Sequence, residues 1–296
     1  MDPAATPYVL RGPLPEMTDP VLLVNLVGWI DASGAGASAV EHIASKTGAV
    51  EVIEFDGDTF VDFRARRPVM EIRDGVNTGV RWNVPVIRAG RDPRGRDVLL
   101  LSGPEPDFSW QLFCRTVGDI CVQAGVRTMV GLGAYPYGAP HTRPVQITHT
   151  TPDRAVSERL PHARNTLDVP AGVLSCLELE LDRRGITAVS FWAQVPHYVA
   201  TMQFSAAGAA LVEVACRETG ISVDTIELMD EAEVQRERLD GLVGANSEHG
   251  DMVTKLEQAY DAAHRPAALD IATDLPTADQ LAAEVEQFLR DQQTGE

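Results

Sequence analysis

The feature that most constrains the fold is the apolar run Val21–Val27, followed directly by the glycine-rich segment Gly28–Gly36. A nearly continuous apolar run is typical of a strand buried on both faces, as in a parallel sheet covered by helices. The next residues predict a helix over 37–46 and a second strand over 49–55. A strand, a helix and a strand in this order form a right-handed unit of a parallel sheet. The expected fold class is therefore α/β with a mostly parallel sheet.

The remaining elements follow from periodicity and turn residues. Short strands over 69–73, 80–89 and 97–102 predict an antiparallel meander that extends the sheet, with 98–101 returning to its centre. Helices are expected over 109–124, 171–184 and 202–219, and strands over 128–132, 146–151 and 188–192. From Thr225 onward the pattern is helical, with breaks near 241–250 and at Pro266 and Pro276.

These elements divide the chain into three parts. Residues 1–20 carry five prolines and are expected to be an extended segment rather than a helix or strand. Residues 21–223 form the α/β domain, and residues 224–296 form a helical C-terminal extension. With 296 residues, 44% of them hydrophobic, the chain is long enough to bury a large core.

The negative charge is concentrated in the C-terminal extension. The chain has a net charge of −18, and residues 224–296 hold 18 Asp and Glu against five Lys and Arg. Such an acidic protein repels phosphates, so nucleic acid is not expected as a partner. The acidic residues either form a solvated helical face or a surface that docks a partner, and both interpretations remain open.

Cysteine usage and the termini indicate a cytoplasmic protein. The four cysteines form no C-x-x-C pair and lie in apolar contexts, so we expect reduced core thiols, with neither disulfides nor a zinc site. No 18-residue apolar segment and no signal peptide are present, so no membrane association is expected. No closely spaced His and Asp set predicts another metal site.

The segment Gly34–Ala39 matches the G-x-G-x-x-G/A dinucleotide fingerprint. In that fingerprint the first glycine comes straight off the strand, whereas here six residues intervene, so no dinucleotide or other cofactor is expected. The preferred interpretation is that Gly34 and Gly36 let the following helix pack closely on the sheet. Asp31 and Ser33 precede this helix and either cap its first turn or face a ligand.

Two further loops, over 131–144 and 192–198, are expected at the carboxyl ends of strands, where parallel sheets bind ligands. The segment 131–144 contains Tyr135, Tyr137, His141 and Arg143, of which His141 is a possible acid or base and Arg143 a possible anion clamp. The alternative is a rigid turn whose rings pack on a neighbouring subunit. The candidate pocket residues are Gly28, Trp29, Asp31, Ser33, Gly34, Glu105, Tyr135, His141, Arg143, His197 and Tyr198. No complete catalytic signature joins them, so no catalytic residue is assigned.

Taken together, four segments resemble the PAC2 family, relatives of proteasome assembly chaperone 2, in its actinobacterial-type members. The segments are Gly28–Gly34, Ser102–Pro106, Gly131–Ala134 with His141–Pro144, and Val195–Tyr198, and the resemblance covers roughly 20–262. It implies a three-layer α/β/α domain similar to nucleoside phosphorylases, a helical C-terminal extension and homo-oligomers that are often trimers. Relatives that engage the proteasome tend to have, as their last three residues, a hydrophobic residue, then Tyr, then any residue. This chain ends in Gln293–Glu296, so docking through such a tail is not expected.

Two function classes follow. The first is a non-enzymatic, chaperone-like oligomeric scaffold that binds protein partners. The alternative is a small-molecule enzyme of the nucleoside phosphorylase or hydrolase type, or one linked to a carboxylate–amine ligase, which would use the polar residues at the strand ends.

Overall fold

The computed structural model describes residues 6–13, 15–164 and 166–264. The strands are β1 (Tyr8–Leu10), β2 (Val21–Val27), β3 (Val50–Phe55), β4 (Val69–Arg73), β5 (Val76–Arg81), β6 (Val86–Arg91), β7 (Asp97–Pro104), β8 (Thr128–Tyr137), β9 (Ile147–Thr150) and β10 (Thr187–Pro196). The helices are α1 (Ala35–Thr47), α2 (Gly57–Phe60), α3 (Trp110–Ala124), α4 (Arg154–Arg159), α5 (Val173–Arg183), α6 (Ser205–Thr219), α7 (Ile226–Gly244) and α8 (Ser247–Ala263). The predicted breaks at Pro266 and Pro276 lie outside the described residues.

The central sheet has the strand order β1-β3-β6-β7-β2-β8-β10-β9. The four neighbours β7, β2, β8 and β10 are parallel and form its centre. The strand β3 runs in the same direction, whereas β1, β6 and β9 run against it. The sheet is therefore mostly parallel, as predicted, and β7 lies at the centre as expected.

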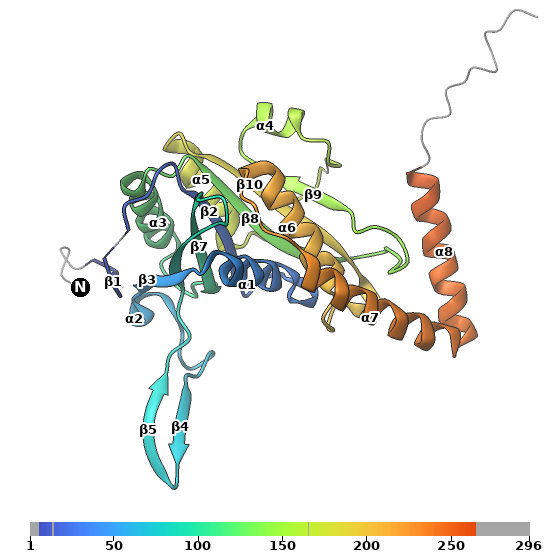
Figure 1. Cartoon of the computed structure of the whole chain (residues 1–296), viewed down its shortest axis with the longest axis horizontal. Coiled ribbons are helices and arrows are strands. Elements are labelled where there is room, and N and C mark those ends of the chain that lie inside the picture. The colour runs from blue at the N-terminus through green and yellow to red at the C-terminus, as the bar shows by residue number, and fades with distance from the viewer. Residues whose placement is uncertain (1–5, 14, 165, 265–296) are drawn as a thin grey trace, which may run out of the picture.

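Helices cover both faces of this sheet and make three layers (Figure 1). On one face α1 and α6 pack on the first core cluster, which includes Leu23, Ile43 and Leu211. On the other face α3 and α5 pack on the second cluster, which includes Leu22, Phe113 and Leu177. Successive residues of β2 enter opposite clusters because side chains alternate along a strand. The predicted α/β/α architecture is confirmed.

Several expected boundaries are wrong. Strands β4 and β5 do not extend the central sheet but form a separate two-stranded sheet, a hairpin that projects from the body (Figure 1). Residues Tyr8–Leu10 form a short strand in the segment expected to lack one, because they pair with the edge strand β3. The short helices α2 and α4 carry no clear periodicity and were not expected.

The C-terminal helices α7 and α8 form an arm that leads away from α6 (Figure 1). A break between them falls at 245–246, within the range that the sequence predicts. Asn246 caps α8, because its side-chain oxygen accepts hydrogen bonds from the amides of Glu248 (2.9 Å) and His249 (3.4 Å). Among the described residues, no helix combines the length and apolar character needed to cross a membrane.

Candidate functional site

The predicted site residues come to one edge of the sheet, where the carboxyl ends of β2, β7, β8 and β10 lie next to one another. The expected loops need a correction there. Strand β8 continues through Tyr137 and β10 through Pro196, so Tyr135 and Tyr137 lie in a strand rather than in a loop. The site residues then separate into three groups with different partners.

In the first group Asp31 caps helix α1. Its carboxylate accepts hydrogen bonds from the amides of Gly36 (2.8 Å) and Ala37 (2.9 Å), and Asn25 Nδ2 lies 3.4 Å away. Burial raises the pKa of Asp31, while these hydrogen bonds oppose the shift. A bound pyrophosphate would need the same helix N-terminal amides, so the capped geometry disagrees with dinucleotide binding at this helix.

The glycines beside Asp31 have two different roles. A Cβ at Gly36 would lie 2.5 Å from the carbonyl oxygen of Leu132, so this glycine allows α1 to approach β8, as predicted. Gly34 has open space around its Cα but a φ of 64°, so its role is conformational rather than close packing. Ser33 also has a positive φ of 58°, and its Oγ is buried without a hydrogen-bond partner among the described residues. Ser33 therefore does not cap α1.

The second group, at the ends of β2 and β7, centres on Glu105. Glu105 is 9% exposed, and its Oε1 accepts a 2.5 Å hydrogen bond from the amide of Val173, the first residue of α5. A Cβ at Gly28 would lie 2.8 Å from the Glu105 Cβ, so glycine leaves the space that the glutamate fills. The Arg66 guanidinium donates to the Glu105 carbonyl oxygen and lies 3.2 Å from Asp107 Oδ1.

This second group keeps unused binding capacity. Within the described chain, no hydrogen bond reaches Glu105 Oε2, although a carboxylate oxygen can accept two. The ring of Trp29, beside Gly172, is half exposed at the same place. An acceptor without a hydrogen-bond partner in the described chain, a neighbouring guanidinium and an exposed indole together suit a small ligand that carries a donor and a flat apolar part.

The third group, at the ends of β8 and β10, is tied to the C-terminal arm. The backbone amide of buried His141 donates to the hydroxyl of Tyr198 (2.8 Å), and His141 Nδ1 lies 2.7 Å from that hydroxyl. His141 Nε2 lies 3.1 Å from Asp240 Oδ1 on α7. The hydroxyl accepts from the amide and donates to Nδ1, so Nε2 carries the proton and donates to Asp240. Both ring nitrogens are therefore engaged, which leaves His141 no free nitrogen for acid–base work on a ligand.

Arg143 contacts the second helix of the arm. Its Nε and Nη2 each donate a 2.8 Å hydrogen bond to the carboxylate of Asp261, and Nη1 donates to Glu257 at 3.1 Å. This bidentate geometry is the strong form of an arginine–carboxylate pair. The same pairing lowers the pKa of Asp261. Arg143 is thus an anion clamp as its residue type predicts, but the anions belong to this chain.

The remaining site residues are less constrained. The Tyr135 hydroxyl accepts a 2.9 Å hydrogen bond from Gln194, and its ring meets Tyr137 edge to face. Tyr137 is half exposed, and His197 is exposed on the turn after β10. Tyr198 is partly buried, and burial raises its pKa.

Sequence reasoning missed the partners of the third group. These are Asp240 on α7 and Glu257, Tyr260 and Asp261 on α8; the Tyr260 hydroxyl donates to the Pro144 carbonyl at 3.1 Å. The only available signal was charge, an acidic extension and a lone arginine in a strand-end loop. Part of the acidic extension therefore pairs with the strand-end residues of this same chain, although Asp240 and Asp261 stay about half exposed.

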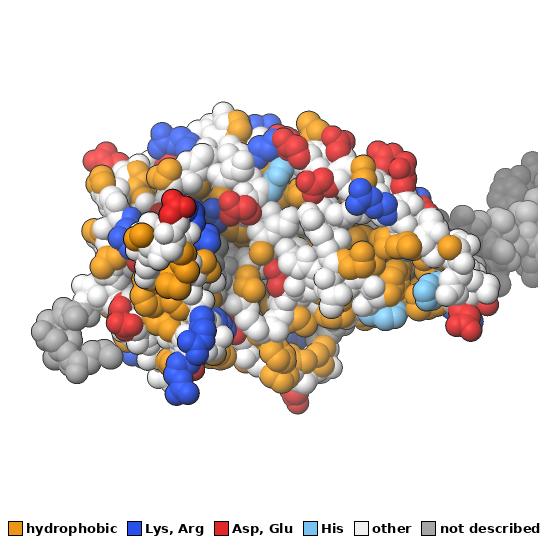
Figure 2. Space-filling model, turned by 90° about the horizontal axis from the view of Figure 1, so that it is seen from below, with side chains coloured by type: hydrophobic (Ala, Val, Ile, Leu, Met, Phe, Trp, Pro, Cys, Tyr) orange, Lys and Arg blue, Asp and Glu red, His pale blue; other side chains and the backbone are white. Residues whose placement is uncertain are grey.

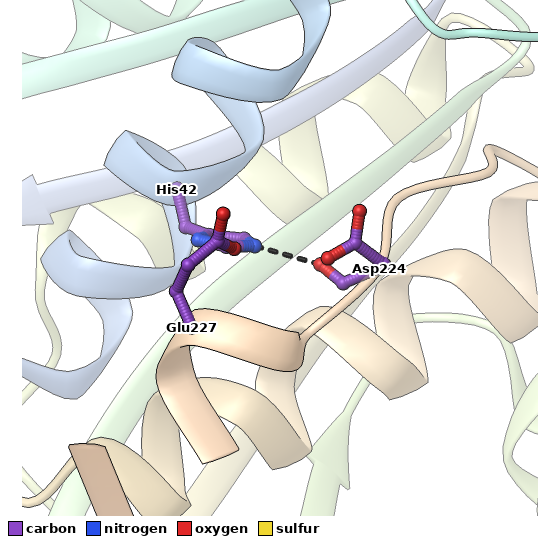
Figure 3. A group of neighbouring side chains, drawn as sticks. All are labelled: His42, Asp224 and Glu227. Atoms are coloured by element: carbon purple, nitrogen blue, oxygen red, sulfur yellow. Dashed lines mark hydrogen bonds between the residues drawn. The ribbon is translucent and has the colours of Figure 1, made fainter. Parts of the chain in front are cut away.

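One group of possible metal ligands lies away from the strand ends. His42 on α1, Asp224 before α7 and Glu227 in the first turn of α7 place one ligand atom each within 4.8 Å of one another (Figure 3). Sequence spacing could not predict this group, because 182 residues separate His42 from Asp224. The four cysteines take no part in it and are free thiols; Cys114 and Cys121 are buried, which raises the pKa of each to about 12.

Comparison with known proteins decides the family. A sequence model of the PAC2 family matches residues 25–243. The chain belongs to the PAC2 family. A PAC2 family protein from Streptomyces avermitilis has 29% identity and a TM-score of 0.73 over 79% of this chain and 100% of its own. No curated protein matches the sequence.

Two Mycobacterium tuberculosis structures are also similar to this PAC2 protein. A protein of unknown function has 30% identity and a TM-score of 0.81, over 89% of this chain and 94% of its own. A proteasome-assembly chaperone homologue has 30% identity and a TM-score of 0.74, over 79% of this chain and 99% of its own. The family resemblance of the strand-end segments is thereby confirmed.

Proposed function

We propose that this PAC2 protein is a non-enzymatic, chaperone-like scaffold that self-associates through the β4–β5 hairpin and binds protein partners as an oligomer, with a trimer favoured. Similarity to a proteasome-assembly chaperone homologue supports the chaperone-like role. The engaged state of His141 and Arg143 removes the two residues that most favoured catalysis. The observation that carries the self-association is the exposed hairpin.

The hairpin presents apolar side chains that its own two strands cannot bury. An isolated two-stranded hairpin is marginally stable in water, and clustered exposed apolar residues mark interaction surfaces. Met70 and Val80 are cross-strand partners, and Ile72 follows Met70 on the same side of β4. Six apolar residues of the hairpin and its base are between 42% and 62% exposed: Val69, Met70, Ile72, Val76, Val80 and Trp82.

Charge favours a second copy of this chain as the occupant. Residues 64–82 hold five arginines against Glu71 and Asp74, so the hairpin region is basic in a chain of net charge −18. Figure 2 shows arginine and apolar side chains together on this projection. An acidic copy of the chain offers the complementary charge, and such complementarity steers association.

Sedimentation analysis of a charge-insertion variant tests this role. The wild type is expected to sediment as an oligomer and the double variant Met70→Glu, Ile72→Glu as a monomer, because each carboxylate would be desolvated in the interface. Val122→Glu is the matched control, since Val122 is equally exposed on α3 outside the hairpin. A monomeric wild type, or an oligomeric double variant, would contradict the proposal. Purified proteasome subunits are the probe for partner binding, and failure to bind them would remove the chaperone-like part alone.

A second candidate function is small-molecule binding at Glu105 and Trp29, favoured by the unused Glu105 Oε2. Thermal-shift screening with nucleosides, phosphate and nucleotides should give a compound that stabilises the wild type but not Trp29→Ala. His197→Ala, an exposed residue at the neighbouring strand end, is the control. If no compound stabilises the wild type more than it stabilises Trp29→Ala, small-molecule binding at Glu105 and Trp29 is contradicted.

A further inference from the structure

The first turn of α7 meets the last turns of α1 through a small polar cluster (Figure 3). His42 Nε2 lies 2.7 Å from the backbone oxygen of Asp224, and one oxygen of each carboxylate, of Asp224 and of Glu227, lies within 4.8 Å of a ring nitrogen of His42. The ligand atoms thus come from two elements that are far apart in sequence. They converge at the root of the C-terminal arm, where α7 leaves the α/β part.

We propose that His42, Asp224 and Glu227 bind a divalent transition-metal ion of the Zn²⁺ class, which fastens the first turn of α7 to α1. One imidazole and two carboxylates are a donor set that Zn²⁺ accepts in tetrahedral sites with water as the fourth ligand. Mg²⁺ and Ca²⁺ prefer oxygen ligands alone, so the histidine selects against them. The backbone carbonyl oxygen of Asp224 is a further possible metal ligand at the same place.

A cation already occupies the carboxylates. Lys46 Nζ lies 2.6 Å from Glu227 Oε1 and 3.5 Å from Asp224 Oδ1, and it comes from the same helix as His42. Two carboxylates face one ammonium group, so the cluster keeps a net negative charge when histidine is neutral. A divalent ion would neutralise that charge and displace the ammonium group, which its flexible stem allows. The Lys46 ammonium group therefore competes with the metal for the two carboxylates and raises the metal concentration needed for binding.

Hydrogen bonds already hold both carboxylates at this place. The Ile226 amide donates to Asp224 Oδ1 at 3.3 Å, and Lys46 Nζ donates to Glu227 Oε1 at 2.6 Å. His42 Nε2 faces a carbonyl oxygen and therefore carries the proton when metal is absent. Metal binding moves this proton to Nδ1, so the Nε2 lone pair becomes the ligand.

The position of the cluster gives the metal a mechanical role. The arm contacts the α/β part again at His141 and Arg143, near the far end of α7 and along α8. A metal at the root would hold the start of α7 independently of those contacts. Metal binding is therefore expected to slow backbone hydrogen exchange in the first turn of α7.

Calorimetric titration of the full chain with Zn²⁺ tests the site. The wild type should bind one Zn²⁺ at this site, and His42→Ala should weaken binding by at least about 10-fold, since even groups behind metal ligands can cost that much. Lys46→Met should bind Zn²⁺ more tightly than the wild type, because the competing ammonium group is gone. His249→Ala, an exposed histidine on α8, is the matched control and should bind like the wild type.

Each result has a defined meaning once circular dichroism shows that the variants are folded. Equal Zn²⁺ affinity of His42→Ala and the wild type would overturn the proposal. Weaker binding by Lys46→Met would also overturn it, because Lys46 would then support the metal instead of competing with it. Mg²⁺ affinity equal to that of Zn²⁺ would contradict the role of the imidazole. Hydrogen exchange in 226–230 that Zn²⁺ leaves unchanged would exclude the fastening of α7.

Discussion

The ends of β2 and β7 and the ends of β8 and β10 lie at the same edge of one sheet, yet they differ in what their polar groups can still bind. At β2 and β7, Glu105 uses one oxygen to cap α5 and leaves Oε2 without a partner among the described residues. At β8 and β10, the side chains of His141 and Arg143 donate their hydrogen bonds to carboxylates of the C-terminal arm. A polar residue at a strand end is therefore available to a ligand only where its hydrogen-bonding capacity is unused.

The largest expected effect is that of Glu105→Ala. The Val173 amide would lose its buried acceptor at the start of α5, so the free energy of unfolding should fall by about 2 kcal/mol. Denaturant unfolding measures this change, and Glu248→Ala, at an exposed site on α8, is the control. A fall in the free energy of unfolding of less than about 0.5 kcal/mol would show that Glu105 is no structural cap. Both carboxylate oxygens would then be available to a ligand.

The next effect distinguishes two histidines at the ends of β8 and β10, His141 and His197. His141→Ala removes a buried ring and its hydrogen bond to Asp240, so hydrogen exchange in α7 and α8 should quicken and unfolding should cost about 1 kcal/mol less. His197→Ala, at the exposed turn after β10, should leave both measurements unchanged. Unchanged exchange in His141→Ala would mean that this region is not closed by the arm.

The smallest effect is a pH dependence confined to the arm. The folded-state pKa of Asp261 is lowered by Arg143, so its contribution is present above the ordinary pKa of 3.8 and is lost as the pH falls through the lowered value. The NMR signal of the Asp261 side-chain carboxyl should therefore keep its neutral-pH position down to about pH 4 and change below it. Arg143→Ala should move this step up toward the ordinary pKa of 3.8. A step that stays at the same low pH in the variant would show that Arg143 does not set it.

Local pattern predicted much of the fold. The alternation of β2 between two core clusters and the helical periodicity of α3, α5 and α6 depend on near neighbours in the chain. Short strands indicate pairing but not the sheet they join, so the predicted meander is wrong for the hairpin of β4 and β5. Proline and glycine usually mark turns, so the pattern predicts loops where the structure has the strand ends Tyr135–Tyr137 and Val195–Pro196.

Short stretches of the chain are enough to predict the fold class, the family and the set of polar residues at the strand ends. Which of these residues form hydrogen bonds with the C-terminal arm follows from tertiary contacts alone. His141 meets Asp240 across 99 residues, and His42 meets Asp224 across 182. Sequence periodicity does not predict such long-range contacts, because they depend on the lengths and directions of the arm's helices. The free oxygen of Glu105 and the cluster at the root of α7 are therefore properties of the folded chain.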